Sequence, residues 1–146
     1  MRLTRPGVSF RRTSETVIGV LYALGTLHQG VFVLRSSRDF YQTMADRAWI
    51  EPAGRFVDNF LIPNSAYVTV SVVAFQGALA VAILTRSRYV APALLAGGVF
   101  SLMGAFTGAP GETVSYLLLA GLHFWLAATH ESLPARQSHN ETVPQP

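Results

Sequence analysis

Residues 89–111 read YVAPALLAGGVFSLMGAFTGAPG, and none of these 23 positions is Asp, Glu, Lys or Arg. Three more windows without charge cover residues 16–34, 59–85 and 113–130. Only 13% of the 146 residues are charged, whereas soluble domains carry roughly a quarter. Because the charged residues are confined to the segments between these windows, the sequence argues against a water-soluble fold.

The uncharged windows have the length of membrane-spanning helices. A bilayer core about 30 Å thick needs about 20 mostly apolar residues in a helix. Lipid cannot hydrogen-bond an open backbone, and these continuous runs lack the alternation of barrel strands. The predicted span cores are residues 17–34, 66–84, 89–107 and 114–130. The predicted fold class is therefore all-α, a membrane four-helix bundle forming a single domain over residues 1–132, followed by a disordered polar tail at 133–146.

The basic residues predict the orientation in the membrane. All eleven are arginine, and seven lie in the N-terminal arm, the turn between the second and third spans, and the tail: Arg2, Arg5, Arg11, Arg12, Arg86, Arg88 and Arg136. Cytoplasmic loops carry the excess of Lys and Arg, so both termini are predicted to be cytoplasmic. No basic helix or aromatic-interleaved stripe points to nucleic acid. The expected partner is the lipid bilayer.

An export signal is an alternative for the N-terminus. Residues 9–12 read SFRR before an apolar stretch, which resembles a twin-arginine signal, and cleavage near Thr26 would remove the first span. The apolar run continues to Leu34, which is longer than a usual signal core. We therefore expect the first span to be retained.

The segment between the first two spans, residues 35–65, is predicted to contain two amphipathic helices. Asp39 is placed as the N-cap of the first, and residues 51–54, EPAG, as its end. The apolar positions of the first fall on one helical face, and so do those of the second: Tyr41, Met44, Ala45, Ala48 and Trp49, then Phe56, Val57, Phe60 and Leu61. The pair either lies in the headgroup region as an interfacial anchor or forms a lid over the outer end of the bundle.

Small residues predict which spans pack together, because they allow helices to approach closely in lipid. They recur every four residues in the second span, at Ala74, Ala78 and Ala82, and in the third, at Ala93, Gly97, Ser101 and Ala105. The connection between the two spans is short. We therefore expect these two stripes to face each other.

Four polar residues lie inside the spans and are the candidate polar core or ligand-binding residues: His28, Gln29, Gln76 and His123. Counting about 1.5 Å per residue places His28 roughly 10 Å deep and Gln76 and His123 roughly 15 Å deep. Since lipid exposure of such groups is unfavourable, we expect them to point toward one another. Interhelical hydrogen bonds and a pocket for a quinone or other lipid headgroup are both consistent with this pattern. Haem ligation by His28 and His123 is disfavoured because their depths differ.

The sequence contains no motif that identifies a reaction. No nucleophile with a base, phosphate-binding glycine loop or paired carboxylate lies within a span, so whether the chain is an enzyme stays open. The absence of cysteine excludes disulfides, cysteine-bound zinc and iron–sulfur clusters in this chain. Any redox role would use a borrowed cofactor.

Two stretches resemble the DoxX-like group of small four-span bacterial membrane proteins. Residues 20–30 read VLYALGTLHQG, and residues 74–84 read AFQGALAVAIL before Arg88 and an Ala-rich third helix. The sequence departs from the family pattern at Gln76, where the family commonly has Glu, and after Gly30, where no Lys follows. The resemblance implies a multi-pass protein of the bacterial plasma membrane and, for some members, association with thiol- or sulfur-oxidising systems and quinone.

Two functions follow from these observations as hypotheses. The first is an accessory membrane protein that binds a lipid or quinone and partners a membrane or peripheral oxidoreductase. The alternative is a quinone-linked oxidoreductase subunit, with His28 and His123 holding the headgroup.

Overall fold

Four long helices follow the four uncharged windows. The computed structural model of the chain describes residues 6–131, and the tail predicted at 133–146 lies outside them. The long helices are α1 (Pro6–His28), α4 (Ser65–Leu84), α5 (Val90–Thr107) and α6 (Pro110–Glu131). Each contains the span core predicted for it, apart from the last residues of the first core and the first residue of the third.

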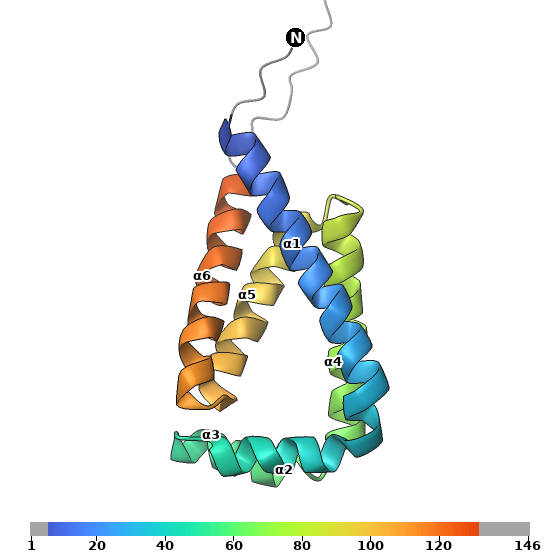
Figure 1. The fold of residues 1–146 in the computed structure, drawn as a ribbon, viewed down its shortest axis with the longest axis vertical. Helices are drawn as coiled ribbons and strands as arrows, with labels where there is room; N and C mark the ends of the chain where they lie inside the picture. Colours follow the sequence, from blue (N-terminus) through green and yellow to red (C-terminus); the bar gives the residue numbers. More distant parts are fainter. Residues whose placement is uncertain (1–5, 132–146) are drawn as a thin grey trace, which may run out of the picture.

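Irregular helical turns redirect the chain after α1. The π-helical turn η1 (Gln29–Val33) and the 3-10 turn η2 (Leu34–Ser36) lead into α2 (Ser37–Arg47). A short break precedes α3 (Glu51–Phe56), which continues into the π-helical turn η3 (Val57–Leu61). Figure 1 shows α2 and α3 lying across one end of the molecule, below the four long helices.

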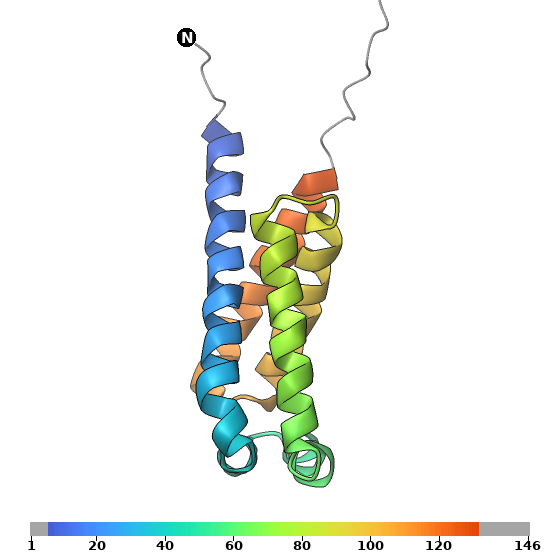
Figure 2. The same ribbon diagram turned by 90° about the vertical axis from the view of Figure 1, so that its right-hand side faces the viewer.

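The long helices form two pairs. The closest packing joins α1 to α4 and α5 to α6, and both views show the pairs standing on the layer of α2 and α3 (Figures 1 and 2). The pairs meet in an apolar core at the end opposite α2. Side chains of all four helices contribute to this core, including Ile18, Ile83, Leu94 and Leu126. At the α2 end the two pairs leave room for the cavity described below.

Within residues 6–131, three stretches are long and apolar enough to cross a membrane: Phe10–Arg47, Ser65–Leu84 and Val90–Thr107. The first includes α2, which lies across the base (Figure 1), so α1 supplies its crossing part. Large apolar side chains, such as Leu24, Val81 and Leu118, are exposed on the outer faces of the long helices. Such faces are rare on soluble monomers, and together these features indicate a multi-pass helical membrane protein in a lipid bilayer.

The helix α6 is present over 22 residues, but it is not among the three apolar stretches. The uncharged segment of this helix, residues 113–130, contains Ser115, His123 and Thr129, which lower its mean hydropathy. The helix is therefore confirmed, while its crossing of the membrane stays a prediction.

The predicted contact between the small-residue stripes of the second and third spans is wrong. Ala74 and Ala78 are exposed on α4. On α5, a Cβ added at Gly97 would lie 2.7 Å from His123 Cδ2, and one added at Gly98 would lie 2.7 Å from Phe124. The small residues of α5 therefore admit large side chains of α6. Bulky side chains lie between α4 and α5 instead, since the Phe75 and Phe100 rings have centroids 5.3 Å apart.

The predicted helices between the first two spans exist with different ends. Ser36, not Asp39, occupies the N-cap position of α2. Residues 51–54 do not end that helix but begin α3, with Pro52 in its first turn. Proline suits the first turn because its missing N–H would have no helical partner there.

Candidate ligand cavity

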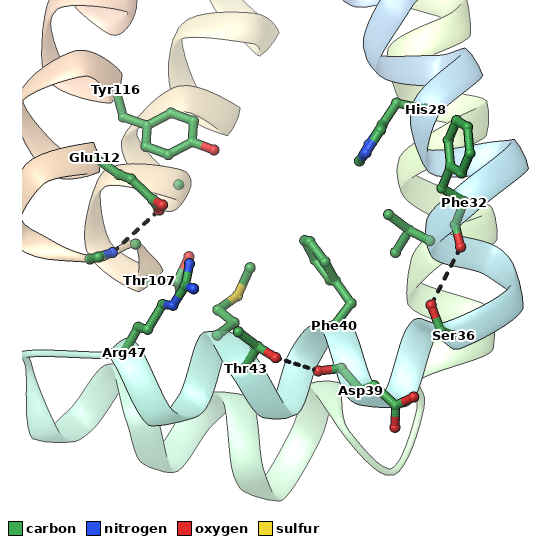
Figure 3. Close-up of a pocket in the computed structure, with 15 residues that line it drawn as sticks. His28, Phe32, Ser36, Asp39, Phe40, Thr43, Arg47, Thr107, Glu112 and Tyr116 are labelled. Carbon is green, nitrogen blue, oxygen red and sulfur yellow. Dashed lines mark hydrogen bonds between the residues drawn. The ribbon is translucent and has the colours of Figure 1, made fainter.

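A cavity of about 510 Å³ lies between the two helix pairs at the α2 end. Its walls come from α1 and η1 on one side and from the α5–α6 turn on the other, and α2 forms its floor (Figure 3). This volume falls within the range of small-molecule sites. The lining mixes apolar and polar side chains and includes Phe32, Phe40, Met44, Thr43 and Thr107.

Two hydrogen-bonding rings face this space from opposite walls. His28, in the last turn of α1, points into the cavity, and the Tyr116 hydroxyl points toward it from α6 (Figure 3). Gly104 on α5 leaves room for the tyrosine, because a Cβ there would lie 3.0 Å from its ring. The Phe40 ring rises from the floor between the two walls (Figure 3). The cavity thus offers a hydrogen-bonding side chain on each wall and an aromatic surface between them.

Opposite charges occupy the side of the cavity near the α5–α6 turn. Arg47, in the last turn of α2, and Glu112, in the first turn of α6, both line it. One oxygen of Glu112, Oε2, accepts a hydrogen bond of 3.4 Å from the Ala109 N–H at the start of the helix. Among the described residues, Arg47 has no carboxylate partner within ion-pair distance. A guanidinium and a carboxylate are therefore both available to a polar ligand group.

A hydrogen bond between side chains ties the floor to the α5–α6 hairpin. The Trp49 indole N–H donates to Thr113 Oγ1 over 3.3 Å. That hydroxyl donates in turn to the carbonyl oxygens of Ala105, at 3.1 Å, and Ala109, at 3.2 Å. Because Trp49 lies just beyond α2, this contact holds the C-terminal end of the floor beneath the cavity.

The four candidate polar residues do not gather into one cluster, contrary to expectation. His28 lines the cavity, but Gln29, Gln76 and His123 do not. Position along a helix gives the depth of a residue in the membrane but not the rotation and tilt of that helix. Residues at similar levels therefore face different neighbours.

His123 is fully buried and pairs with Tyr22 of α1. The Tyr22 hydroxyl lies 2.9 Å from His123 Nε2, and His123 Nδ1 lies 2.7 Å from the Leu119 carbonyl oxygen. The carbonyl can only accept, so Nδ1 carries the proton and Nε2 accepts from Tyr22. Both ring nitrogens are engaged, and this histidine therefore offers no free lone pair to a haem iron.

Gln76 packs against α1, where Gly25 leaves it space. A Cβ at Gly25 would lie 2.9 Å from Gln76 Oε1. That oxygen and the Oε1 atom of Gln29 are both buried and accept no hydrogen bond from the described residues. Gln76 therefore belongs to the contact between α1 and α4 rather than to the cavity.

Sequence reasoning missed Arg47, Glu112, Tyr116 and Phe40 as cavity residues. A signal was present, because in a four-span topology the segment at 35–65 and the turn at 108–112 lie on the same side of the membrane. Arg47 and Glu112 are therefore expected at the same end of the molecule. Their placement in the lining of one cavity depends on the direction of α2, which the hydrophobic pattern does not give.

The chain was compared with described protein families, curated proteins and solved structures, and none of them matches it.

Proposed function

We propose that this protein is an accessory membrane protein that binds an amphiphilic molecule with a polar ring headgroup, a quinone, in the cavity between α1, α2 and α6. The proposal rests on one observation: His28 and Tyr116 face each other from opposite walls of a partly aromatic cavity (Figure 3). The cavity lies at the α2 end of the four long helices, whose outer faces carry exposed apolar side chains. A ligand delivered from the bilayer suits that position.

The chemistry of a quinone matches this arrangement of donors. A quinone ring carries carbonyl oxygens at opposite edges, and both can only accept hydrogen bonds. A donor on each of two facing walls, His28 and Tyr116, fits this pattern. The faces of the ring can stack on an aromatic side chain such as Phe40. The Glu112 carboxylate, an acceptor, complements the hydroxyl groups of the reduced form.

The alternative, a subunit that passes electrons to quinone, loses one of its two assigned residues. It relied on His28 and His123 together, and only His28 lines the cavity. The accessory role in a redox system is supported by the resemblance of residues 20–30 and 74–84 to DoxX-like proteins. Membership in that group is itself part of the proposal.

Tryptophan fluorescence tests the proposal. The chain has two tryptophans, and W125F leaves Trp49, whose hydrogen-bond partner Thr113 is adjacent to Glu112. Titration of this variant in detergent with a short-chain quinone is expected to give saturable quenching. Adding Tyr116→Phe should raise the dissociation constant about fivefold, the effect of losing a hydrogen bond worth about 1 kcal/mol.

Matched variants separate binding from partitioning into the micelle. W49F leaves Trp125, whose ring centroid lies 6.1 Å from that of Phe10 near the other end of α6. Trp125 lies away from the cavity, so its quenching reports partitioning alone and should be linear whether or not the loss of Trp49 loosens the floor. Tyr67→Phe removes a hydroxyl from an exposed tyrosine on α4 and should leave the dissociation constant unchanged. Equal quenching of both tryptophans, or equal effects of the two tyrosine variants, would refute quinone binding in this cavity.

A further inference from the structure

Arginine residues collect at the end of the molecule opposite α2. The first turns of α1, the α4–α5 turn and the end of α6 all lie there (Figures 1 and 2). The charged residues of this arginine end, within residues 6–131, are Arg11, Arg12, Arg86, Arg88, Glu15 and Glu131. The surplus is two positive charges. The opposite end, with four arginines and five carboxylates, has a surplus of one negative charge.

One of these arginines is already engaged in structure. Arg11 Nε lies 3.3 Å from Glu15 Oε1, and Arg11 Nη1 donates to the Thr129 carbonyl over 3.1 Å. This group joins α1 to the end of α6 and neutralises Glu15. The other three arginines of this end, Arg12, Arg86 and Arg88, are exposed.

Arg86 adopts a backbone conformation that normally favours glycine. Arg86 has φ of +52° and is the one non-glycine residue with positive φ in the described part of the chain. Its N–H donates to the Ile83 carbonyl, and the Ser87 N–H donates to the Ala82 carbonyl. This is the Schellman ending of a helix, in which glycine is the usual residue because a Cβ is unfavourable in that conformation. Arginine here forgoes a better backbone fit and adds an exposed positive charge.

Arg88 packs against a tyrosine, a residue typical of the interface between water and lipid. Its guanidinium lies 4.9 Å from the centroid of the Tyr89 ring, and Arg88 Nη2 donates to the Tyr89 hydroxyl over 2.6 Å. Tyrosines are enriched where the hydrocarbon meets the headgroups. Neither Arg86 nor Arg88 has a carboxylate partner within ion-pair distance among the described residues.

We propose that Arg12, Arg86 and Arg88 form a binding surface for the headgroups of anionic phospholipids. A phosphate group accepts hydrogen bonds from guanidinium groups that have no carboxylate partner. The three side chains come from α1 and from the α4–α5 turn, so one layer of headgroups can contact both helix pairs. The surface lies opposite the cavity and does not depend on what the cavity binds.

Lipid retention tests this surface. The protein is reconstituted in nanodiscs with equal amounts of phosphatidylglycerol and phosphatidylcholine and extracted into mild detergent, and the retained lipids are quantified by mass spectrometry. The intact protein is expected to retain phosphatidylglycerol preferentially. The triple variant R12Q/R86Q/R88Q should lower the ratio of the two lipids at least about fivefold, the effect of roughly one basic residue near an anionic surface.

The control removes the same charge from the opposite end. R35Q/R38Q/R55Q changes three exposed arginines there and should leave the ratio unchanged. Inorganic phosphate added during extraction should not displace the lipid, whereas displacement would assign the site to free phosphate. Equal loss in both triple variants, or no loss in either, would overturn the proposal.

Discussion

Gly97 is the residue on which the buried contact between three helices depends. A Cβ at this position would lie 2.8 Å from His123 Nε2 and would also clash with the Tyr22 hydroxyl. We expect Gly97→Ala to break the Tyr22–His123 hydrogen bond and to lower the free energy of unfolding in detergent by about 1–3 kcal/mol, as overpacking does.

Gly121→Ala is the control for that change. It lies on α6 with nothing within 4 Å of an added Cβ, so it should be neutral or slightly stabilising, since alanine favours a helix over glycine by up to about 1 kcal/mol. Thermal unfolding of both variants measures the difference. Equal stability of the two variants would mean that the Tyr22–His123 contact carries no packing constraint.

At Arg86 the side-chain charge is proposed to bind lipid, whereas the positive φ of the backbone lowers the stability of the fold. Arg86→Gly should raise the free energy of unfolding by about 1 kcal/mol, because glycine adopts positive φ without strain. Arg86→Lys keeps both the charge and the Cβ and should leave stability unchanged. A destabilised Arg86→Gly protein in thermal unfolding would contradict the strain argument.

The sequence identified the polar residues but not their partners. The depth of His123 in its helix follows from counting residues, and its burial follows from the unfavourable exposure of imidazole to lipid. Its partner Tyr22 could not be predicted, because a tyrosine in a span is equally suited to packing and to hydrogen bonding. Which groups meet is set by the rotation of α1 against α6, and that rotation comes from packing over the whole helix.

At the scale of helices, the small-residue pattern predicted close approach correctly and the partner wrongly. The five residues between the two helices, Thr85 to Tyr89, force only the ends of α4 and α5 together. Farther along, Phe75 and Phe100 hold the two helices apart. The glycines of α5 instead receive His123 and Phe124 of α6. A short connection therefore fixes neighbours at a turn, and side-chain volume decides them elsewhere.

The contact between Trp49 and Thr113 controls how firmly α2 covers the cavity. Trp49→Phe keeps an aromatic ring but removes the N–H that donates to Thr113. Loss of a hydrogen bond worth about 1 kcal/mol should speed hydrogen exchange of the backbone in residues 37–47 about fivefold. Trp125→Phe, at the other end of the molecule, should leave that exchange unchanged. Equal exchange in the two variants would show that the floor is held by its apolar contacts alone.

For the whole molecule, the division into charged and uncharged segments predicted the architecture well. Four helices at the expected positions follow from it, because a charge inside a span is expensive and a helix is the only open-chain structure that lipid accepts. The cavity does not follow from this pattern. It arises because the two helix pairs pack closely at one end and stand on a transverse layer at the other, and that geometry depends on the direction taken after η1.

The arrangement of the ends also predicts the topology, including the crossing by α6. The start of α1 and the end of α6 lie at the same end of the molecule (Figure 1), as four crossings require.

The chain has no cysteine, so a single introduced cysteine reports its own side of the membrane. In intact bacterial cells, a membrane-impermeant maleimide should label Q42C and G111C but not T85C or H130C. In inverted membrane vesicles the two sets should exchange, since the arginine end is predicted to be cytoplasmic. The parent chain, without cysteine, supplies the blank. Labelling of G111C and H130C from one side would show that α6 lies along the membrane instead of crossing it, and would leave three spans.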